Sequence, residues 1–149
     1  MLRPIQQPDT RFLRDMLRHA YHWRLAEDPD VPVYRYVRAW GRPGDAGLIA
    51  FEGRNVFGAA WYRLFPEREP GFGFVDEQTA ELTIAVVPSH RGRGTGAELL
   101  EALLAQGRAD AYDRLSLSAE RGQTAFYEQH GFTVVREGDE AVTMVVTLA

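Results

Sequence analysis

The stretch that most constrains the fold runs from Ala85 to Leu104, AVVPSHRGRGTGAELLEALL. It begins with apolar residues typical of a strand, continues into a loop with three glycines and two arginines, and ends in leucines at helical spacing. A helix start carries partial positive charge, and glycines allow successive N–H groups to converge on one anion. The stretch therefore predicts a phosphate or pyrophosphate site, with a solvated glycine-rich turn as the alternative.

Two other phosphate-binding motifs are alternatives to this interpretation of the loop. A P-loop requires a lysine, and all 17 basic residues of the chain are arginine. Gly92, Gly94 and Ala97 satisfy the G-x-G-x-x-A pattern of dinucleotide-binding folds, and Glu120 lies where a ribose-binding acid would follow. However, Pro88 to Arg91 separate the strand from the first glycine, and the chain after Glu120 is too short to complete a parallel half-domain. A dinucleotide-binding protein is therefore a weaker alternative.

Composition narrows the class of protein further. A length of 149 residues predicts one domain, 1–149. The absence of cysteine excludes disulfides, thiolate metal sites and a cysteine nucleophile, and nothing pairs His19 and His22 with a third metal ligand, so no metal is expected. The net charge of −4 disfavours nucleic-acid binding. Because there is no signal pattern and no apolar run of roughly 20 residues, we expect a soluble, cytoplasmic protein without a membrane partner.

Hydrophobic periodicity predicts a mixed α+β domain around a single sheet, partly parallel and partly antiparallel. The predicted order is strand, helix, helix, strand, strand, strand, helix, strand, helix, strand, strand. The predicted helices cover residues 9–23, 33–40, 94–110 and 122–130, and the predicted strands and hairpins cover 1–6, 48–65, 79–87, 114–119 and 132–148. Within the first hairpin, Trp61 and Tyr62 are adjacent, so one is expected to face inward and the other outward.

Two motifs together resemble the GNAT superfamily of N-acetyltransferases. Arg91, Gly94 and Gly96 match the family's [Q/R]-x-x-G-x-[G/A] signature for acetyl-CoA, after a strand that ends in a Val-x-Pro-like segment. FYEQHGF, residues 126–132, is similar to the family's Tyr-x-x-x-Gly-Phe box. The order of predicted elements matches as well, so the resemblance covers the whole chain and implies a GNAT fold. The chain departs from the family pattern in the loop before the second motif, at Glu120 and Gln123.

The resemblance implies an N-acetyltransferase that moves an acetyl group from acetyl-CoA to a primary amine by direct attack. The residues that would bind the pyrophosphate are Arg91, Gly92, Arg93, Gly94, Thr95 and Gly96. Val86 and Val87 would offer backbone groups to the pantetheine arm. Tyr127 resembles the family's general acid for the departing thiolate. Glu81 is the candidate base, provided that no β-bulge near Ala85 reverses the faces of its strand.

The sequence says less about the chemical identity of the acceptor than about the donor. In the family the first two helices form the acceptor side, and here that region carries aromatic and acidic side chains: Tyr21, Trp23, Tyr34, Tyr36, Trp40, Glu27, Asp28 and Asp30. Together they could hold an ammonium through cation–π and charge contacts, or the aromatics could fill the core. A small-molecule amine and a protein N-terminus both stay open as acceptors, and a non-catalytic acyl-CoA-binding module stays open as another function. An exposed strand at either sheet edge would also allow a homodimer.

Overall fold

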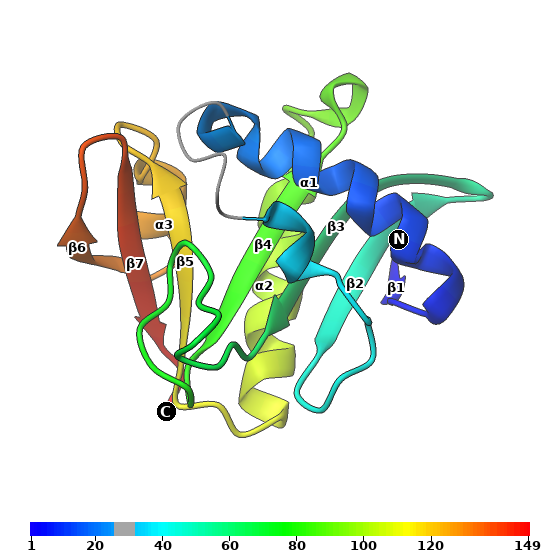
Figure 1. Cartoon of the computed structure of the whole chain (residues 1–149). Helices are drawn as coiled ribbons and strands as arrows, with labels where there is room; N and C mark the ends of the chain where they lie inside the picture. The colour runs from blue at the N-terminus through cyan, green and yellow to red at the C-terminus, as the bar shows by residue number, and fades with distance from the viewer. Residues whose placement is uncertain (26–31) are drawn as a thin grey trace.

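A seven-stranded sheet organises the chain in the computed structural model, which describes residues 1–25 and 32–149 (Figure 1). The strands are β1 (Leu2–Pro4), β2 (Ala46–Glu52), β3 (Asn55–Arg63), β4 (Ala80–Val86), β5 (Arg114–Glu120), β6 (Thr133–Glu137) and β7 (Ala141–Thr147). Their spatial order is β1-β2-β3-β4-β5-β7-β6. Only β4 and β5 pair in parallel, while every other neighbouring pair is antiparallel. The single mixed sheet predicted from the sequence is confirmed.

The helical elements follow the predicted order with one exception. They are α1 (Thr10–Leu25), α2 (Thr95–Ala109) and α3 (Ala125–Glu128), with short 3-10 turns η1 (Gln7–Asp9), η2 (Val33–Tyr36) and η3 (Pro88–His90). The helix expected over residues 33–40 is wrong, because only the turn η2 forms there. The guanidinium of Arg63 binds the carbonyl oxygens of Arg35 and Arg38, at 3.0 and 2.6 Å, and these oxygens would otherwise be available to an α-helix.

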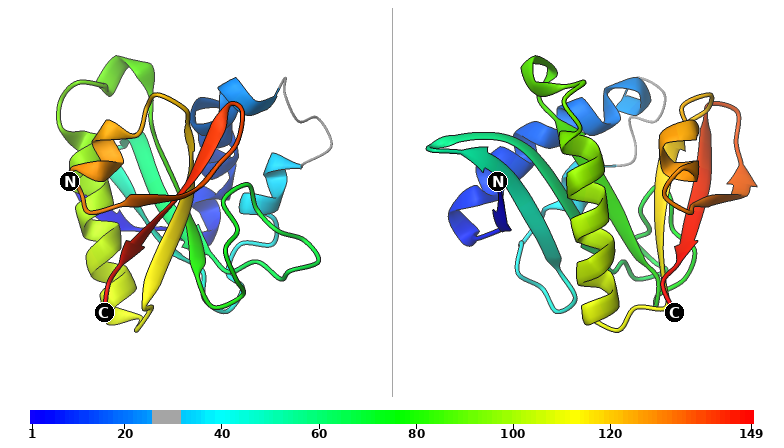
Figure 2. Two further views of the ribbon diagram at one scale, coloured as in Figure 1. Left: turned by 90° about the vertical axis from the view of Figure 1, so that its left-hand side faces the viewer. Right: turned by 180° about the vertical axis from the view of Figure 1, so that it is seen from behind.

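Helices cover both faces of the sheet. Helix α1 lies on one face, and α2 and α3 lie on the other, as the view from behind shows (Figure 2). Trp61 belongs to the core cluster under α1 and Tyr62 to the cluster under α2, and both are 0% exposed. The expectation that one of them faces outward is therefore wrong, since neither face of β3 is open to solvent. Among the described residues, no helix is long and apolar enough to cross a membrane.

A buried ion pair attaches η2 and the following loop to the sheet. Arg63 on β3 is 0% exposed and makes two hydrogen bonds to Asp45, from Nε to Oδ1 at 2.9 Å and from its terminal nitrogen to Oδ2 at 2.6 Å. Because the same guanidinium also donates to the backbone around η2, its charge is fully paired inside the protein. This pairing holds Tyr36, on η2, against the sheet.

The parallel strands β4 and β5 separate soon after they begin. They pair only at Ala80 with Leu115 and at Glu81 with Ser116. Strand β4 nevertheless keeps an unbroken register with β3 from Glu81 to Val86, so no bulge reverses its faces. The separation leaves β4 and β5 without a shared ladder beyond Ser116, and the candidate site lies there.

Candidate active site

The glycine loop, residues 91–96, ends in the first two residues of α2. Gly92 and Gly94 have φ values of +77° and +81°, and a Cβ at either would meet nothing within 4 Å, so glycine is favoured here by backbone conformation rather than by space. Gly94 is the N-cap of α2, and no side chain in the described part of the protein caps this helix start. The first amides of α2 therefore face outward without an intrahelical partner, which is the geometry that binds anions.

A cleft of about 460 Å³ opens between β4 and β5, where the two strands have separated. Its walls come from the end of α1, the second half of β4, the glycine loop, the end of β5 and α3. Among the residues predicted from the sequence, Val86, Arg91, Gly96 and Tyr127 border it. The cleft therefore connects the start of α2 with Tyr127.

Val86 and Val87 have different backbone environments. The amide of Val87 donates to the carbonyl of Phe57 on β3, at 2.9 Å. Because backbone groups alternate sides along an antiparallel strand, those of Val86 point away from β3 and toward the cleft. The Val86 carbonyl accepts a hydrogen bond from Nε of Arg91, at 3.0 Å. Of these two valines, Val86 turns its backbone toward the cleft, whereas the amide of Val87 is bonded within the sheet.

Tyr127 lies on α3, where the cleft meets a smaller inner cavity of about 20 Å³. Its ring packs edge-on against Phe126 and Phe132, with centroid distances of 5.2 and 5.9 Å. Burial raises the pKa of its hydroxyl to about 12. The hydroxyl is therefore protonated at neutral pH and can donate a hydrogen bond.

Glu81 borders neither the inner cavity nor the cleft. Its side chain is on the α1 face of the sheet, is 1% exposed and accepts a hydrogen bond from the hydroxyl of Tyr36. The amide of Phe72 donates to the same hydroxyl, at 2.7 Å. Gly71 covers the carboxylate so closely that any side chain there would collide with Oε1.

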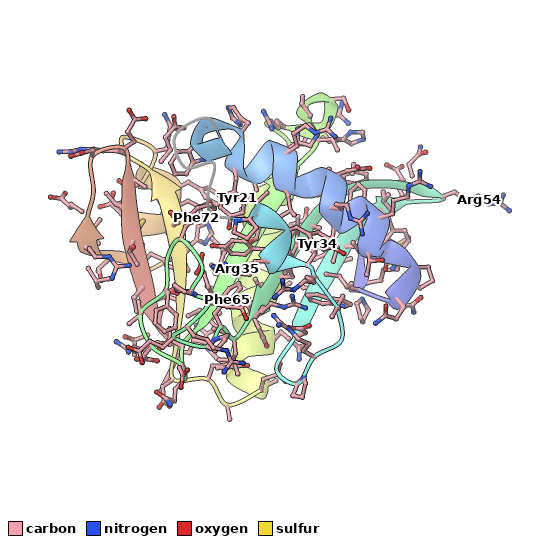
Figure 3. The ribbon with its side chains drawn as sticks, viewed as in Figure 1. Tyr21, Tyr34, Arg35, Arg54, Phe65 and Phe72 are labelled. Carbon is pink, nitrogen blue, oxygen red and sulfur yellow. The ribbon has the colours of Figure 1, made fainter. Side chains whose placement is uncertain are left out.

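A buried series of hydroxyl groups connects Glu81 with the inner cavity. Tyr36, which contacts Glu81, lies against Tyr21 with a ring-centroid distance of 5.0 Å. The Tyr21 hydroxyl is 2.8 Å from Oγ1 of Thr83, which borders the cavity. Burial, followed by the negative charge of Glu81, holds the pKa of both tyrosines well above its usual value. Figure 3 shows Tyr21 beside Phe72, in the region where α1, η2 and the loop before β4 meet.

The aromatic residues considered for the acceptor side have separate locations. Tyr21 and Tyr36 are buried in the core. Trp40 lies beside the guanidinium of Arg63. The guanidinium of Arg14 covers one face of Tyr34, with its carbon atom 4.8 Å from the ring centroid. Trp23 borders the cleft. The acidic candidates of this region, Glu27, Asp28 and Asp30, lie outside the described residues.

Two of the four histidines border the cleft, and the other two lie elsewhere. His19 and His22 border the cleft, although the sequence indicated no role for them. The ring of His90 stacks on that of Phe57, with a centroid distance of 4.3 Å. Nδ1 of His130 lies 2.6 Å from Oε1 of Glu101. In the described part of the chain, no group of three histidine or acidic side chains could hold a metal.

Sequence reasoning missed Thr83 and Ser118, two hydroxyl residues at the cavity. A signal for Ser118 was present, because serines alternate with apolar residues along β5, in RLSLSAE. This alternation places Ser116 and Ser118 on the face opposite the leucines.

Comparison with known families defines the class of protein that carries this fold and cleft. The acetyltransferase (GNAT) family model matches residues 10–132. The chain therefore belongs to the GNAT acetyltransferase family and is an acyltransferase enzyme. This membership removes the dinucleotide-binding alternative.

Solved structures share the fold over the full length of the chain. The putative acetyltransferase yncA of Salmonella typhimurium, determined with acetyl-CoA, is 22% identical with a TM-score of 0.73, over 100% of this chain and 94% of that one. The ribosomal-protein-alanine N-acetyltransferase of Brucella melitensis is 21% identical with a TM-score of 0.69, over 99% of both chains. The paia N-acetyltransferase of Thermoplasma acidophilum, determined with coenzyme A, is 17% identical with a TM-score of 0.70, over 99% of this chain and 98% of that one. No curated protein sequence matched significantly.

Proposed function

We propose that the protein transfers an acetyl group from acetyl-CoA to a primary amine by direct attack of the amine on the thioester. The observation that carries this proposal is the single cleft that joins the uncapped start of α2 to the protonated hydroxyl of Tyr127. Two relatives of the same fold were determined with acetyl-CoA or coenzyme A, which supports the choice of donor. When bound, acetyl-CoA supplies the acetyl thioester and a thiolate leaving group.

The residues around the cleft fit such a donor. The first amides of α2 would hold the pyrophosphate, and the exposed guanidiniums of Arg91 and Arg93 would add positive charge. Gly96 lies at the cleft wall, where a Cβ would stand 3.6 Å from the Phe126 ring and narrow the passage. The backbone of Val86 would pair with the amides of the pantetheine arm.

Tyr127 would stabilise the departing sulfur without giving up its proton. Its hydroxyl has a pKa of about 12, whereas an ordinary thiol has a pKa of about 8.5. Full transfer of the proton to the thiolate would therefore be uphill by about 5 kcal/mol. We infer that the hydroxyl donates a hydrogen bond to the developing thiolate instead, which refines the general-acid role expected from the sequence.

Glu81 would act as the base through the buried hydroxyls. Holding an alkylamine neutral at pH 7 costs about 4.6 kcal/mol, so the amine needs a proton acceptor. In this proposal Oγ1 of Thr83 takes the proton and passes its own to the hydroxyl of Tyr21. Tyr21 would then pass its proton to the hydroxyl of Tyr36, whose ring packs against its own, and the proton of Tyr36 would move to Oε2 of Glu81. Each hydroxyl gains one proton and loses one, and the carboxylate becomes neutral.

Acetyl transfer is tested by following coenzyme A release with a thiol reagent across a panel of amines and short peptides. The chain contains no cysteine, so the protein contributes no signal. We expect release that depends on one class of amine. Release that never exceeds the acetyl-CoA blank, while coenzyme A binds, would favour a non-catalytic binding module.

The proton relay is tested separately with Thr83→Val, which keeps the shape of the side chain and removes its hydroxyl. The loss of kcat should be largest near neutral pH and should shrink as the pH rises through about 10.4, where half of the amine is already neutral. A loss of equal size at every pH would instead indicate a structural role for Thr83.

A further inference from the structure

We propose that His130 and Glu101 form a positioning pair, which holds α3 against α2 and so fixes the hydroxyl of Tyr127 at the cleft. This inference rests on the proposed acetyl transfer and extends the site to two residues outside the cleft. Neither His130 nor Glu101 borders the cleft or the inner cavity. The pair therefore acts on the reaction through the helices that it joins.

Helix α3 is too short to hold its own position. It contains four residues, Ala125–Glu128, and within the described chain no side chain caps its start. A single turn of helix is marginal in water unless other parts of the protein stabilise it. Because Tyr127 lies in this turn, the placement of its hydroxyl depends on the contacts that α3 and its flanking residues make with the rest of the protein.

The contact between His130 and Glu101 links α3 to α2, which lies beside it on the same face of the sheet (Figure 2). Nδ1 of His130, two residues after α3, lies 2.6 Å from Oε1 of Glu101, in the first half of α2. An ionised carboxylate only accepts hydrogen bonds, so the histidine nitrogen donates. Among the described residues, no other hydrogen bond joins residues 124–130 to a different helix or strand.

Two routes connect this contact to Tyr127. The first is the backbone, because the amides of His130 and Phe132 both donate to the Tyr127 carbonyl, at 2.9 and 3.1 Å. The second is a row of rings. The His130 ring lies against that of Phe126, with a centroid distance of 5.1 Å, and Phe126 packs edge-on against Tyr127 at 5.2 Å. A shift of the His130 side chain would therefore move Tyr127 as well.

The exposure of the pair separates its effect on the rate from its effect on stability. The side chain of Glu101 is 58% exposed, and that of His130 is 15% exposed. A pair with one partner so open to solvent contributes little to the stability of the whole protein, so its loss should leave the fold intact. Catalysis depends more steeply on position, since a misplacement of about 1 Å can lower a rate by about 100-fold.

Three variants of α2 test the pair without altering any residue of α3. Glu101→Ala breaks the contact. Glu101→Gln keeps the length of the side chain and an oxygen that can accept a hydrogen bond from Nδ1 of His130. Gln106→Ala is the matched control, because it removes a 3.1 Å hydrogen bond to Asp110 at the far end of the same helix.

With the fastest amine of the panel, Glu101→Ala should lower kcat about tenfold, while the KM for acetyl-CoA changes by less than about twofold because the start of α2 is intact. Glu101→Gln should keep at least about half of the wild-type kcat, and Gln106→Ala should keep all of it. In a Tyr127→Phe background, Glu101→Ala should cause no further loss, because the hydroxyl that the pair positions is absent. A wild-type kcat for Glu101→Ala, or a tenfold loss that persists in the Tyr127→Phe background, would overturn the proposal.

Hydrogen exchange tests the pair without relying on turnover. In Glu101→Ala the amides of His130 and Phe132 should exchange about tenfold faster than in the wild type, because α3 opens more often, whereas Gln106→Ala should leave both rates unchanged. Unchanged exchange in Glu101→Ala would overturn the proposal even in an active transferase. Faster exchange in a protein that releases no coenzyme A with any amine would instead count against the proposed function and reduce the pair to a structural contact.

Discussion

Tyr127→Phe removes a single oxygen from the proposed hydrogen-bond donor and leaves the packing of its ring in place. The ring contacts Phe126 and Phe132, and phenylalanine preserves both contacts. No hydrogen bond of the Tyr127 hydroxyl occurs within the described residues, so its removal should change the free energy of unfolding by no more than about 0.5 kcal/mol. Activity should respond far more strongly than stability.

The expected loss of activity follows from the charge on the leaving sulfur. A hydrogen bond to a charged group contributes about 1.5–3 kcal/mol. Its loss in the transition state corresponds to a fall in kcat of about 10- to 160-fold. Because the pKa of the hydroxyl is about 12, Tyr127 stays protonated throughout the assay range and should produce no alkaline fall in rate near pH 9.

The assay is the initial rate of coenzyme A release at saturating acetyl-CoA and amine, with a thermal melt of each variant. Tyr112→Phe is the matched control, because its hydroxyl lies past the far end of α2 and donates to the Gly44 carbonyl at 3.2 Å. The control should retain wild-type kcat. A less than threefold fall in kcat for a well-folded Tyr127→Phe protein would refute the reasoning.

Three further predictions concern the cleft and the fold. Gly96→Ala adds a methyl group 3.6 Å from Phe126, so coenzyme A affinity should fall about tenfold in calorimetry while the melting temperature holds or rises, because alanine favours the helix. Arg63→Ala leaves the Asp45 charge buried and should cost about 3–5 kcal/mol in denaturant unfolding, whereas an unchanged midpoint would contradict the buried pair. Asp9→Asn should cost no more than about 1 kcal/mol at pH 7, because its partner Arg3 is partly exposed. The Arg3 hydrogen bond lowers the pKa of Asp9, so this stabilisation is present above the ordinary carboxyl pKa and disappears as the pH falls through the lowered value, which unfolding curves between neutral and acid pH would show.

Local sequence patterns predicted the parts of the protein that depend on neighbouring residues. The glycine loop and the start of α2 form as expected, because the positive φ angles at Gly92 and Gly94 and the leucine spacing are local properties. Both hairpins form for the same reason. The assignment of the residues to acetyl-CoA stays a prediction.

Distant contacts account for what the sequence did not predict. The expected second helix ends as the turn η2 at Tyr36, and the carbonyl oxygens of Arg35 and Arg38 accept hydrogen bonds from Arg63, a residue far along the chain. The environment of Glu81 depends on Tyr36, 45 residues away, and on the glycine at position 71, so its burial and its distance from the cavity could not be inferred from strand parity. Ser118 was visible only as an alternation in β5, and its position beside the cleft and the inner cavity depends on segments that are far apart in the sequence.

The central claim is that the cleft between β4 and β5 delivers acetyl-CoA to an amine. Mass spectrometry of the amine after incubation with acetyl-CoA and the protein tests it most directly, with Tyr127→Phe as a parallel sample. The account predicts an amine that gains one acetyl group, at a rate that falls at least tenfold in the variant. An amine that stays unmodified across small amines and peptides, although acetyl-CoA binds to the protein, would contradict it.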